Sequence, residues 1–458
     1  SVTDERRVCH VYCKRLSLSH LDINMTMRVV RPLLAAAKRG ARLLVPVRLF
    51  RKGTNRLFDL DVEFYADIAN HDLIVKNLTR RGCVADLDEI RELWEELKVK
   101  HKNEQMRIDL QRAIARMPNM THPDVLGRES DEPVVVDIIG EKPMLDFVPR
   151  RFEYLMGRMG LLQADPNFNV MCGERTYFFR GDLARLEEAL LSFTVDKLLK
   201  KGFTPVYVPD LLHPEHVEAC GMLTTGLRTQ VYRLRTNWGT EVCLSGTAEM
   251  ALANMYRDQC LDMSDLPQRV MAVSRCYRAE ISSTKAEKGI YRVHMFNKVE
   301  MYGFAAPGQS AALRKEFVEI QKEICRDLNL HVQLLDMPPI DLGLSAYRKL
   351  DMEAWMPGSR QYGEITSASD CTDYQSRRLG ITCRQTLGEP PSYVFTTNGT
   401  ACAVPRMLTA IVENYQQKDN SVVIPEVLRK YMNNKTLMEP FGTERTPRWV
   451  PFYFMENR

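Results

Sequence analysis

The sequence predicts an α+β protein whose larger domain is built on an antiparallel sheet with flanking helices. Apolar residues recur at three- and four-residue steps between residues 86 and 117, which is typical of amphipathic helices. A polar, glycine-containing segment at residues 281–290 separates two strand-like runs, which indicates a hairpin. Elsewhere, strand-like and helical runs alternate, as expected for helices packed on a sheet. The strand-like runs include residues 206–208 and 295–304, and the helical runs include residues 183–200, 313–328 and 407–415.

The composition is ordinary for a globular protein and favours two or three domains. The chain has 458 residues, of which 45% are hydrophobic and 27% are charged. It has no apolar run long enough to span a bilayer. We expect neither a membrane nor DNA as a partner. Its 12 cysteines form no Cys-x-x-Cys set, which favours reduced thiols over zinc ligands or disulfides.

Residues 1–58 are predicted to be a leader and mitochondrial presequence, largely disordered. No acidic residue occurs from residue 26 to residue 58, and basic residues are interleaved there with Val, Leu and Ala. The alternative is a basic arm that binds RNA phosphates. We expect translation to start at Met25 or Met27 and the mature protein to lie in the mitochondrial matrix. The basic residues are Arg28, Arg31, Lys38, Arg39, Arg42, Arg48, Arg51, Lys52 and Arg56.

Residues 59–150 are predicted to form a small N-terminal domain and a linker. The two helices at about residues 86–117 make a short antiparallel hairpin, which ends at Pro118. The segment after Val125, to about Pro149, is rich in Pro, Gly and acidic residues, which is typical of a linker. Basic residues near the tip of the hairpin either contact RNA or form a solvated helix face. These residues are Lys98, Lys100, Lys102, Arg107 and Arg112.

Residues 151–458 are predicted to be the catalytic domain, and its most informative segment is the expected hairpin. Alternate residues of a strand point to one face, so Arg278 and Glu280 are expected to project together. Phe296 and Glu300 are expected to project from the returning strand. A guanidinium for phosphate, a ring for a base and a carboxylate for an amine suit a site for a nucleotide and an amino acid.

This hairpin resembles motif 2 of the class II aminoacyl-tRNA synthetases, and specifically of the seryl-tRNA synthetases. Other segments resemble further elements of that family and occur in the family's order. The resemblance covers about residue 148 to the C-terminus and implies the class II antiparallel-sheet fold. The similar segments are Pro209 (motif 1), residues 245–249 (serine binding), residues 364–367 with 373–378 (metal and ATP binding) and residues 398–406 (motif 3).

The resemblance implies serine–tRNA ligase activity with ATP and Mg²⁺, in which Arg278, Arg406 and Glu364 are the catalytic residues. It assigns Mg²⁺ to Glu364 and Ser367, oxygen ligands that suit a hard cation. The implied ATP-binding residues are Arg278, Ala279, Glu280, Arg292, Phe296, Glu364, Ile365, Thr366, Ser367 and Arg406. The implied L-serine-binding residues are Thr247, Ala248, Glu249, Glu300, Asn398 and Thr400.

The implied partners are tRNA(Ser) and a second copy of the chain in a homodimer, or a paralogue in a heterodimer. Two features depart from the family pattern. The helical arm is short, and Asp370 occupies a position where the family usually has Asn. These departures keep two alternatives open. One is a catalytically inactive mitochondrial paralogue that binds RNA or protein. The other is an enzyme that forms an aminoacyl-adenylate for a small molecule or a carrier protein.

Overall fold

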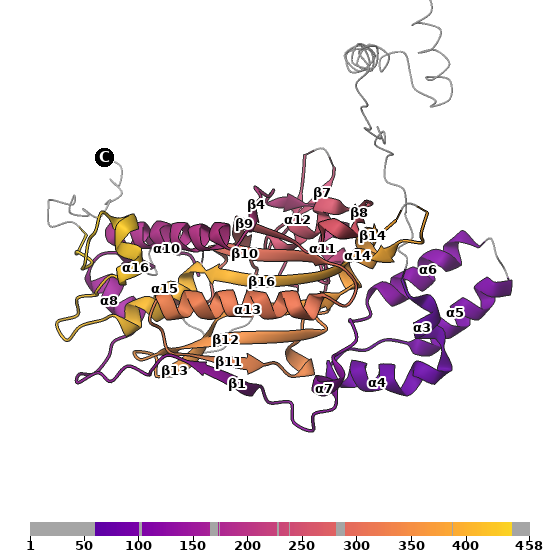
Figure 1. Ribbon diagram of the computed structural model, residues 1–458, viewed down its shortest axis with the longest axis horizontal. Coiled ribbons are helices and arrows are strands. Elements are labelled where there is room, and N and C mark those ends of the chain that lie inside the picture. The colour runs from indigo at the N-terminus through magenta and orange to yellow at the C-terminus, as the bar shows by residue number, and fades with distance from the viewer. Residues whose placement is uncertain are drawn as a thin grey trace, which may run out of the picture. The chain divides into compact units, whose positions relative to one another are not determined.

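An eight-stranded sheet is the centre of the computed structural model (Figure 1). Its strand order is β1-β11-β12-β13-β16-β10-β9-β4. All neighbouring pairs are antiparallel except β4 and β9, which are parallel. The α+β fold with an antiparallel sheet is therefore confirmed. The strands are β1 (Val134–Ile139), β4 (Thr204–Pro205), β9 (Gln268–Tyr277), β10 (Met295–Ala305), β11 (Val332–Asp336), β12 (Arg348–Met356), β13 (Gln361–Thr372) and β16 (Phe395–Ala403).

The structure describes residues 60–99, 103–164, 173, 175–226, 229–237, 239–280, 289–386 and 388–441. All of them belong to one unit of the chain, Leu57–Arg458. The predicted leader and presequence, residues 1–58, lie outside the described residues. Among the helices of the described ranges, none combines the length and the apolar character needed to cross a membrane.

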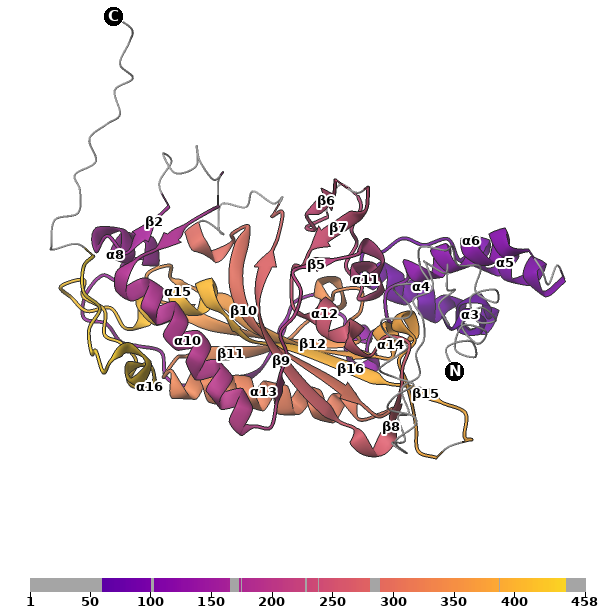
Figure 2. The same ribbon diagram turned by 90° about the horizontal axis from the view of Figure 1, so that it is seen from above.

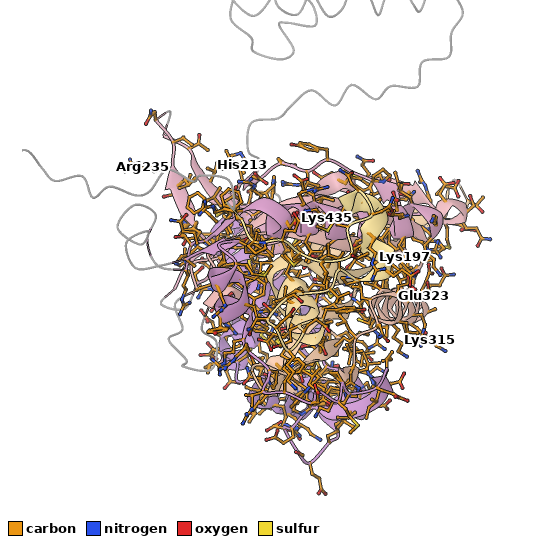
Figure 3. All side chains as sticks on the ribbon, turned by 90° about the vertical axis from the view of Figure 1, so that its left-hand side faces the viewer. Lys197, His213, Arg235, Lys315, Glu323 and Lys435 are labelled. Atoms are coloured by element: carbon orange, nitrogen blue, oxygen red, sulfur yellow. The ribbon has the colours of Figure 1, made fainter. Side chains whose placement is uncertain are left out.

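Three long helices pack on the sheet. Helix α13 (Ser310–Asp327) lies along the face formed by β10, β13 and β16, where Phe317 is fully buried (Figure 1). The other two are α10 (Gly181–Lys200) and α15 (Val404–Asn414). Ion pairs join the C-terminal ends of α10 and α13: Lys197 Nζ lies 3.2 Å from Glu323 and 2.7 Å from Asp327 (Figure 3). The apolar residues of these helices and of the sheet form the largest core.

Shorter elements surround the sheet. The short helices are α7 (Pro123–Leu126), α8 (Phe152–Arg158), α11 (Pro214–Ala219), α12 (Glu249–Ala253), α14 (Tyr374–Leu379) and α16 (Glu426–Arg429). The strands of the small sheets are β2 (Leu162–Gln163) with β3 (Phe178–Phe179), β5 (Leu211–Leu212) with β6 (Arg233–Arg235) and β7 (Glu241–Leu244), and β8 (Cys260–Asp262) with β14 (Thr382–Arg384) and β15 (Ser392–Tyr393). Together with the loops between them, α12 and α14 close over one face of the sheet beside β10 and β16 (Figure 2).

The N-terminal helices form a separate core of their own. They are α3 (Val62–Ala66), α4 (His71–Arg80), α5 (Leu87–Val99) and α6 (Glu104–Ala115). Helices α5 and α6 make the short hairpin predicted for about residues 86–117, and Ile90 and Ile114 are fully buried within it. The buried Arg81 joins this part to the catalytic part, since its guanidinium donates to the backbone oxygens of Ala346 (2.8 Å) and Gly343 (2.5 Å).

Two local predictions are wrong. Residues 134–139, which we assigned to a linker, form β1, the edge strand of the main sheet that pairs with β11. Residues 206–208, predicted as a strand, follow the two-residue strand β4 without continuing it. Both differences concern sheet edges, where pairing depends on distant parts of the chain and not on local sequence.

Candidate active site

The hairpin β9–β10 supplies the first part of the site. Its register places Cys276 opposite Phe296, Ser274 opposite Lys298 and Ala272 opposite Glu300. These paired residues share one face of the sheet. Strand β9 ends at Tyr277, however, so Arg278 and Glu280 do not continue its alternation as predicted. Glu280 has φ = 40°, a left-handed conformation that turns the chain away from the strand direction.

Arg278 and Phe296 come together as predicted. The Arg278 guanidinium carbon lies 5.4 Å from the centre of the Phe296 ring. Its Nε is buried and has no hydrogen-bond partner among the described residues. The backbone oxygen of Arg278 accepts a hydrogen bond from His294, whose Nδ1 lies 2.9 Å away. A half-buried guanidinium whose buried Nε has an unused donor suits an anionic oxygen.

Glu280 and Arg292, both predicted to bind ATP, pair with each other. Arg292 Nη1 lies 3.0 Å from a carboxylate oxygen of Glu280, which is 7% exposed. Arg175 holds the same turn, because its Nη1 donates to the backbone oxygen of Glu280 at 2.7 Å. Ala279 takes part through its backbone N–H, which donates to the Gln230 oxygen at 2.8 Å. The turn is therefore fixed from several sides.

The predicted catalytic residues Glu364 and Arg406 form an ion pair of 2.8 Å between β13 and the first turn of α15. The Tyr291 ring lies 4.7 Å from the Arg406 guanidinium, and the Tyr291 hydroxyl donates to the Glu364 backbone oxygen at 2.9 Å. Burial alone would raise the pKa of Glu364, but Arg406 and Lys349 outweigh burial and hold this pKa well below its usual value. The carboxylate therefore stays ionised at neutral pH.

The predicted metal ligands Glu364 and Ser367 both lie on β13, next to strand β12. Ser367 is paired with Asp351 on the neighbouring strand β12, and a bulge at Ile365 separates this pair from Glu364. Asp351 is 4% exposed, and its Oδ1 has no hydrogen-bond partner among the described residues. Burial raises the pKa of Asp351, although Lys349 opposes the shift from 2.7 Å away. An unsatisfied buried carboxylate oxygen beside the Ser367 hydroxyl fits a hard cation.

The described ranges contain no group of three His, Cys, Asp or Glu side chains arranged to hold a metal ion. Protein oxygens alone would therefore leave a cation at Glu364 incompletely coordinated. Mg²⁺ in nucleotide sites usually has few protein ligands, and phosphate oxygens and water supply the others. The residues present fit a cation that arrives with a nucleotide.

The predicted serine-binding residues meet around the Glu300 carboxylate, which is 2% exposed. The Thr247 hydroxyl lies 3.1 Å from Glu300 Oε2, and the Thr400 hydroxyl lies 3.5 Å from the same oxygen. Lys298 forms an ion pair with that oxygen too. Thr366 supports the arrangement from the next strand, since its hydroxyl donates to the Thr400 backbone oxygen. The pocket thus combines one carboxylate with two hydroxyl groups.

A second carboxylate, Glu249, lies at the start of α12 beside this pocket. Its Oε1 accepts hydrogen bonds from Asn398 Nδ2 at 2.8 Å and from Gln375 Nε2 at 2.7 Å. Burial, and then repulsion from Glu300, raise the pKa of Glu249 to about 7. Ala248, fully buried, is the residue that precedes the helix. Glu249 therefore orients Asn398 and titrates near neutral pH.

Asp370 does not point into this site. It is paired with Thr397 on β16, whereas its neighbour Ser369 is paired with Asn398 of the pocket, so the two side chains leave opposite faces of the sheet. Asp370 is 4% exposed and accepts a hydrogen bond from the Thr372 backbone N–H at 2.9 Å. Burial raises its pKa, and Ser310 and Arg314 of α13 act against the shift. The extra charge is thus held beneath α13.

Four site residues were not predicted: Lys298, Lys349, Asp351 and Gln375. Lys298 lies two positions before Glu300 on β10, and Asp351 lies directly across from Ser367 on the neighbouring strand. Each therefore shares a sheet face with a predicted residue. Strand alternation from Glu300 would have identified Lys298. Gln375 is a helix residue that reaches Glu249 from 126 positions away in the sequence. The motif resemblance included its segment, residues 373–378, but gave Gln375 no role.

Known proteins share both the sequence and the fold. Residues 232–415 match the family model described as the tRNA synthetase class II core domain (G, H, P, S and T). The chain is 43% identical to the mitochondrial serine–tRNA ligase of Bos taurus over 74% of this chain and 64% of that protein. It is 42% identical to the corresponding protein of Mus musculus, over 76% of this chain and 68% of that protein. The matched region thus spans about two thirds of these relatives.

Solved structures agree with this. The seryl-tRNA synthetase from Pyrococcus horikoshii, solved with ATP, has a TM-score of 0.74 and 27% identity, covering 83% of this chain and 99% of that chain. The cytoplasmic enzyme from Naegleria fowleri, solved with AMP, has the same TM-score of 0.74 and 25% identity, with the same coverage of 83% and 99%. The antiparallel sheet and the site on it define a class II aminoacyl-tRNA synthetase. Within this class, the chain belongs to the seryl-tRNA synthetase family.

Proposed function

We propose that the chain is a serine–tRNA ligase, which activates L-serine with ATP to seryl-adenylate and transfers the seryl group to the 3′ end of mitochondrial tRNA(Ser). The observation that supports this most is the position of Glu300, a buried carboxylate that contacts Thr247 and Thr400. A carboxylate for the ammonium group and hydroxyls for the hydroxyl group match serine. Such a pocket rejects alanine because the polar groups would lose their partners.

In the proposed first step, a serine carboxylate oxygen attacks the α-phosphorus of ATP, and pyrophosphate leaves. No protein nucleophile is required, so catalysis comes from positioning and from charge neutralisation. The unused Arg278 Nε suits the serine carboxylate and the α-phosphate, and Phe296 offers a ring face for adenine. Adenine can stack on the Phe296 ring only if the Arg278 guanidinium, which now lies over that ring, moves away from it. Glu280 accepts a hydrogen bond from the adenine amino group, and Arg406 holds the far end of the triphosphate.

Mg²⁺ would be held by Glu364 and Ser367 and, when bound, would neutralise charge on the phosphates. The Glu364 carboxylate can accept it because the low pKa of this group keeps it ionised. Arg406, which now pairs with Glu364, would have to share that carboxylate or turn toward the phosphates. The Thr366 hydroxyl donates to the Thr400 backbone oxygen and keeps Thr400 in place while Arg406 and Glu364 change partners.

The helical hairpin α5–α6 is the proposed tRNA-contacting arm, and it is short, with 13 and 12 residues in its two helices. Among the described residues of the hairpin, Lys98 pairs with Glu95 at 2.7 Å and Arg112 with Asp109 at 3.3 Å. Lys100 and Lys102 lie outside the described residues. These pairs reduce the positive potential of the arm. We therefore propose that basic residues outside the hairpin contribute much of the tRNA affinity.

A homodimer is proposed as the working unit, formed through α10 and the segment after β4. Apolar side chains are exposed on these elements, with Tyr207 at 99% and Leu199 at 46%. Tyr207→Asp should convert a dimer to a monomer in analytical ultracentrifugation. Val84→Asp, which changes an equally exposed residue at 99% in the N-terminal part, should leave the dimer intact. Equal sedimentation of the two variants would contradict this interface.

Mitochondrial location is proposed from the acid-free, basic stretch at residues 26–58 and from the two mitochondrial relatives. Import of the full chain into isolated mitochondria, with loss of the N-terminal stretch, tests it.

Serine-dependent exchange of pyrophosphate into ATP tests the activity itself, with Arg278→Ala as the control. Exchange that disappears in the control, followed by charging of mitochondrial tRNA(Ser), is the expected result. A folded protein that exchanges no pyrophosphate but binds RNA would favour the inactive paralogue. Exchange without tRNA charging would favour an adenylate-forming enzyme with another acceptor.

A further inference from the structure

Lys298 is a buried cation that the proposed reaction does not yet use. It lies on β10 two residues before Glu300, so both side chains leave the same face of the sheet. The exposed fractions of the two side chains are 7% and 3%, and they form an ion pair through Lys298 Nζ and Glu300 Oε2. The same oxygen is the one that the Thr247 and Thr400 hydroxyls approach. A lysine ammonium therefore occupies the place proposed for the ammonium of serine.

The electrostatics of the pocket do not favour two ammonium groups on Glu300. In a buried site, two cations that share one carboxylate repel each other strongly because little water screens them. The other titratable groups that face Glu300 do not remove this conflict. Glu249 has a pKa raised to about 7 by burial and by Glu300, and burial raises the pKa of the Cys276 thiol. Glu249 Oε1 is already held by Asn398 and Gln375, so Glu300 is the carboxylate that each ammonium group would use.

We propose that Lys298 is a positioning residue that serves as the resident counter-ion of Glu300 and is replaced there by the ammonium group of bound serine. This inference rests on the proposed function. Before serine binds, Lys298 holds the Glu300 carboxylate beside Thr247 and Thr400. Serine then binds by exchange of one ammonium group for another, so the pocket never buries an unpaired carboxylate.

Replacing Lys298 by a neutral residue should make serine binding depend on pH. A buried carboxylate without its counter-ion takes up a proton more readily, and serine must then displace that proton. Because Glu249 titrates near pH 7 in every variant, each variant is compared with the wild type at the same pH. The affinity of Lys298→Met for serine should be at least tenfold weaker than that of the wild type at pH 6.5, and most of this difference should disappear at pH 8.5. Lys298→Arg should behave as the wild type at both pH values.

The measurement is isothermal titration calorimetry of L-serine into the full chain. Lys298→Gln keeps a hydrogen-bond donor toward Glu300 and serves as the second neutral variant if Lys298→Met does not fold. An equal loss of affinity at both pH values, or no loss, would overturn the counter-ion role. If the wild type binds no serine, the proposed function itself fails. If the wild type binds serine and the substitutions have no effect, only the role of Lys298 fails.

Exchange of the two ammonium groups is tested with 3-hydroxypropanoate, which has the carboxylate and the hydroxyl of serine but no amine. In the wild type this ligand leaves the Lys298–Glu300 pair intact, so the amine of serine adds little. In Lys298→Met at pH 8.5, Glu300 has no partner until an amine arrives. The preference for serine over 3-hydroxypropanoate should therefore rise at least tenfold in that variant, and an unchanged preference would overturn the exchange.

Discussion

The Glu300→Gln substitution should separate the stability of the serine pocket from its function. It removes one charge of a pair whose side chains are only 7% and 3% exposed, and leaves the Lys298 ammonium buried without a counter-ion. Breaking a buried ion pair on one side typically costs about 3–5 kcal/mol. Because the Gln amide oxygen can still accept from Thr247, we expect the lower end of this range, about 3 kcal/mol.

The double variant Glu300→Gln with Lys298→Met removes both charges and should restore most of the lost stability. Replacing both members of a buried pair by uncharged groups of similar volume is often neutral. Urea-induced unfolding followed by circular dichroism measures the stability of both variants and the wild type. Pyrophosphate exchange should be lost in both variants, because neither has a carboxylate for the serine ammonium.

A single variant as stable as the wild type would refute the conclusion that the pair is buried and tightly coupled. A double variant that is no more stable than the single variant would refute it as well. Serine-dependent exchange retained in the double variant would show that Glu300 does not receive the ammonium.

Three further outcomes are expected. Thr400→Val should lower kcat/KM for serine in pyrophosphate exchange by about 10–100-fold, because it removes a hydroxyl hydrogen bond at the charged Glu300. Asp370→Asn should change the KM for ATP less than about twofold, because Asp370 faces α13, and a larger change would contradict that orientation. The folded-state pKa of Glu249, about 7, lies above its unfolded value, so its neutral form stabilises the fold at low pH and this contribution is lost as pH rises through 7. Glu249→Gln should accordingly gain stability relative to the wild type as pH rises from 4.5 to about 7 in thermal unfolding, and parallel pH profiles would contradict the raised pKa.

The residue types of the site could be predicted from sequence, whereas their pairing could not. Arg278 lies beside Phe296, and Thr400 lies beside Glu300; the motif resemblance assigned all four residues to one site. The Glu364–Arg406 pair was not foreseen, since it depends on how β13 and α15 meet across 42 residues. Glu280 does not follow the predicted alternation of side chains, because strand β9 ends at Tyr277 and Glu280 itself has a left-handed backbone conformation. Local periodicity cannot indicate such a turn.

The side of the sheet that Asp370 faces was left open by the sequence. It depends on the register of β13 against β16, which long-range hydrogen bonds fix. In contrast, strand β1 did have a local signal. Three consecutive valines and two isoleucines are typical of a strand. The Pro, Gly and acidic residues around them concealed that signal.

Strand β1 also determines where the catalytic part of the chain can be cut. A protein shortened to begin at residue 151 would lack this edge strand. The backbone donors and acceptors of β11 that pair with β1 would then be exposed. An uncovered strand edge invites pairing with other chains, so such a fragment should aggregate. A fragment that begins before Val134 keeps the edge covered. The boundary between the two parts of this protein, as far as independent folding is concerned, therefore lies upstream of the segment that looks like a linker.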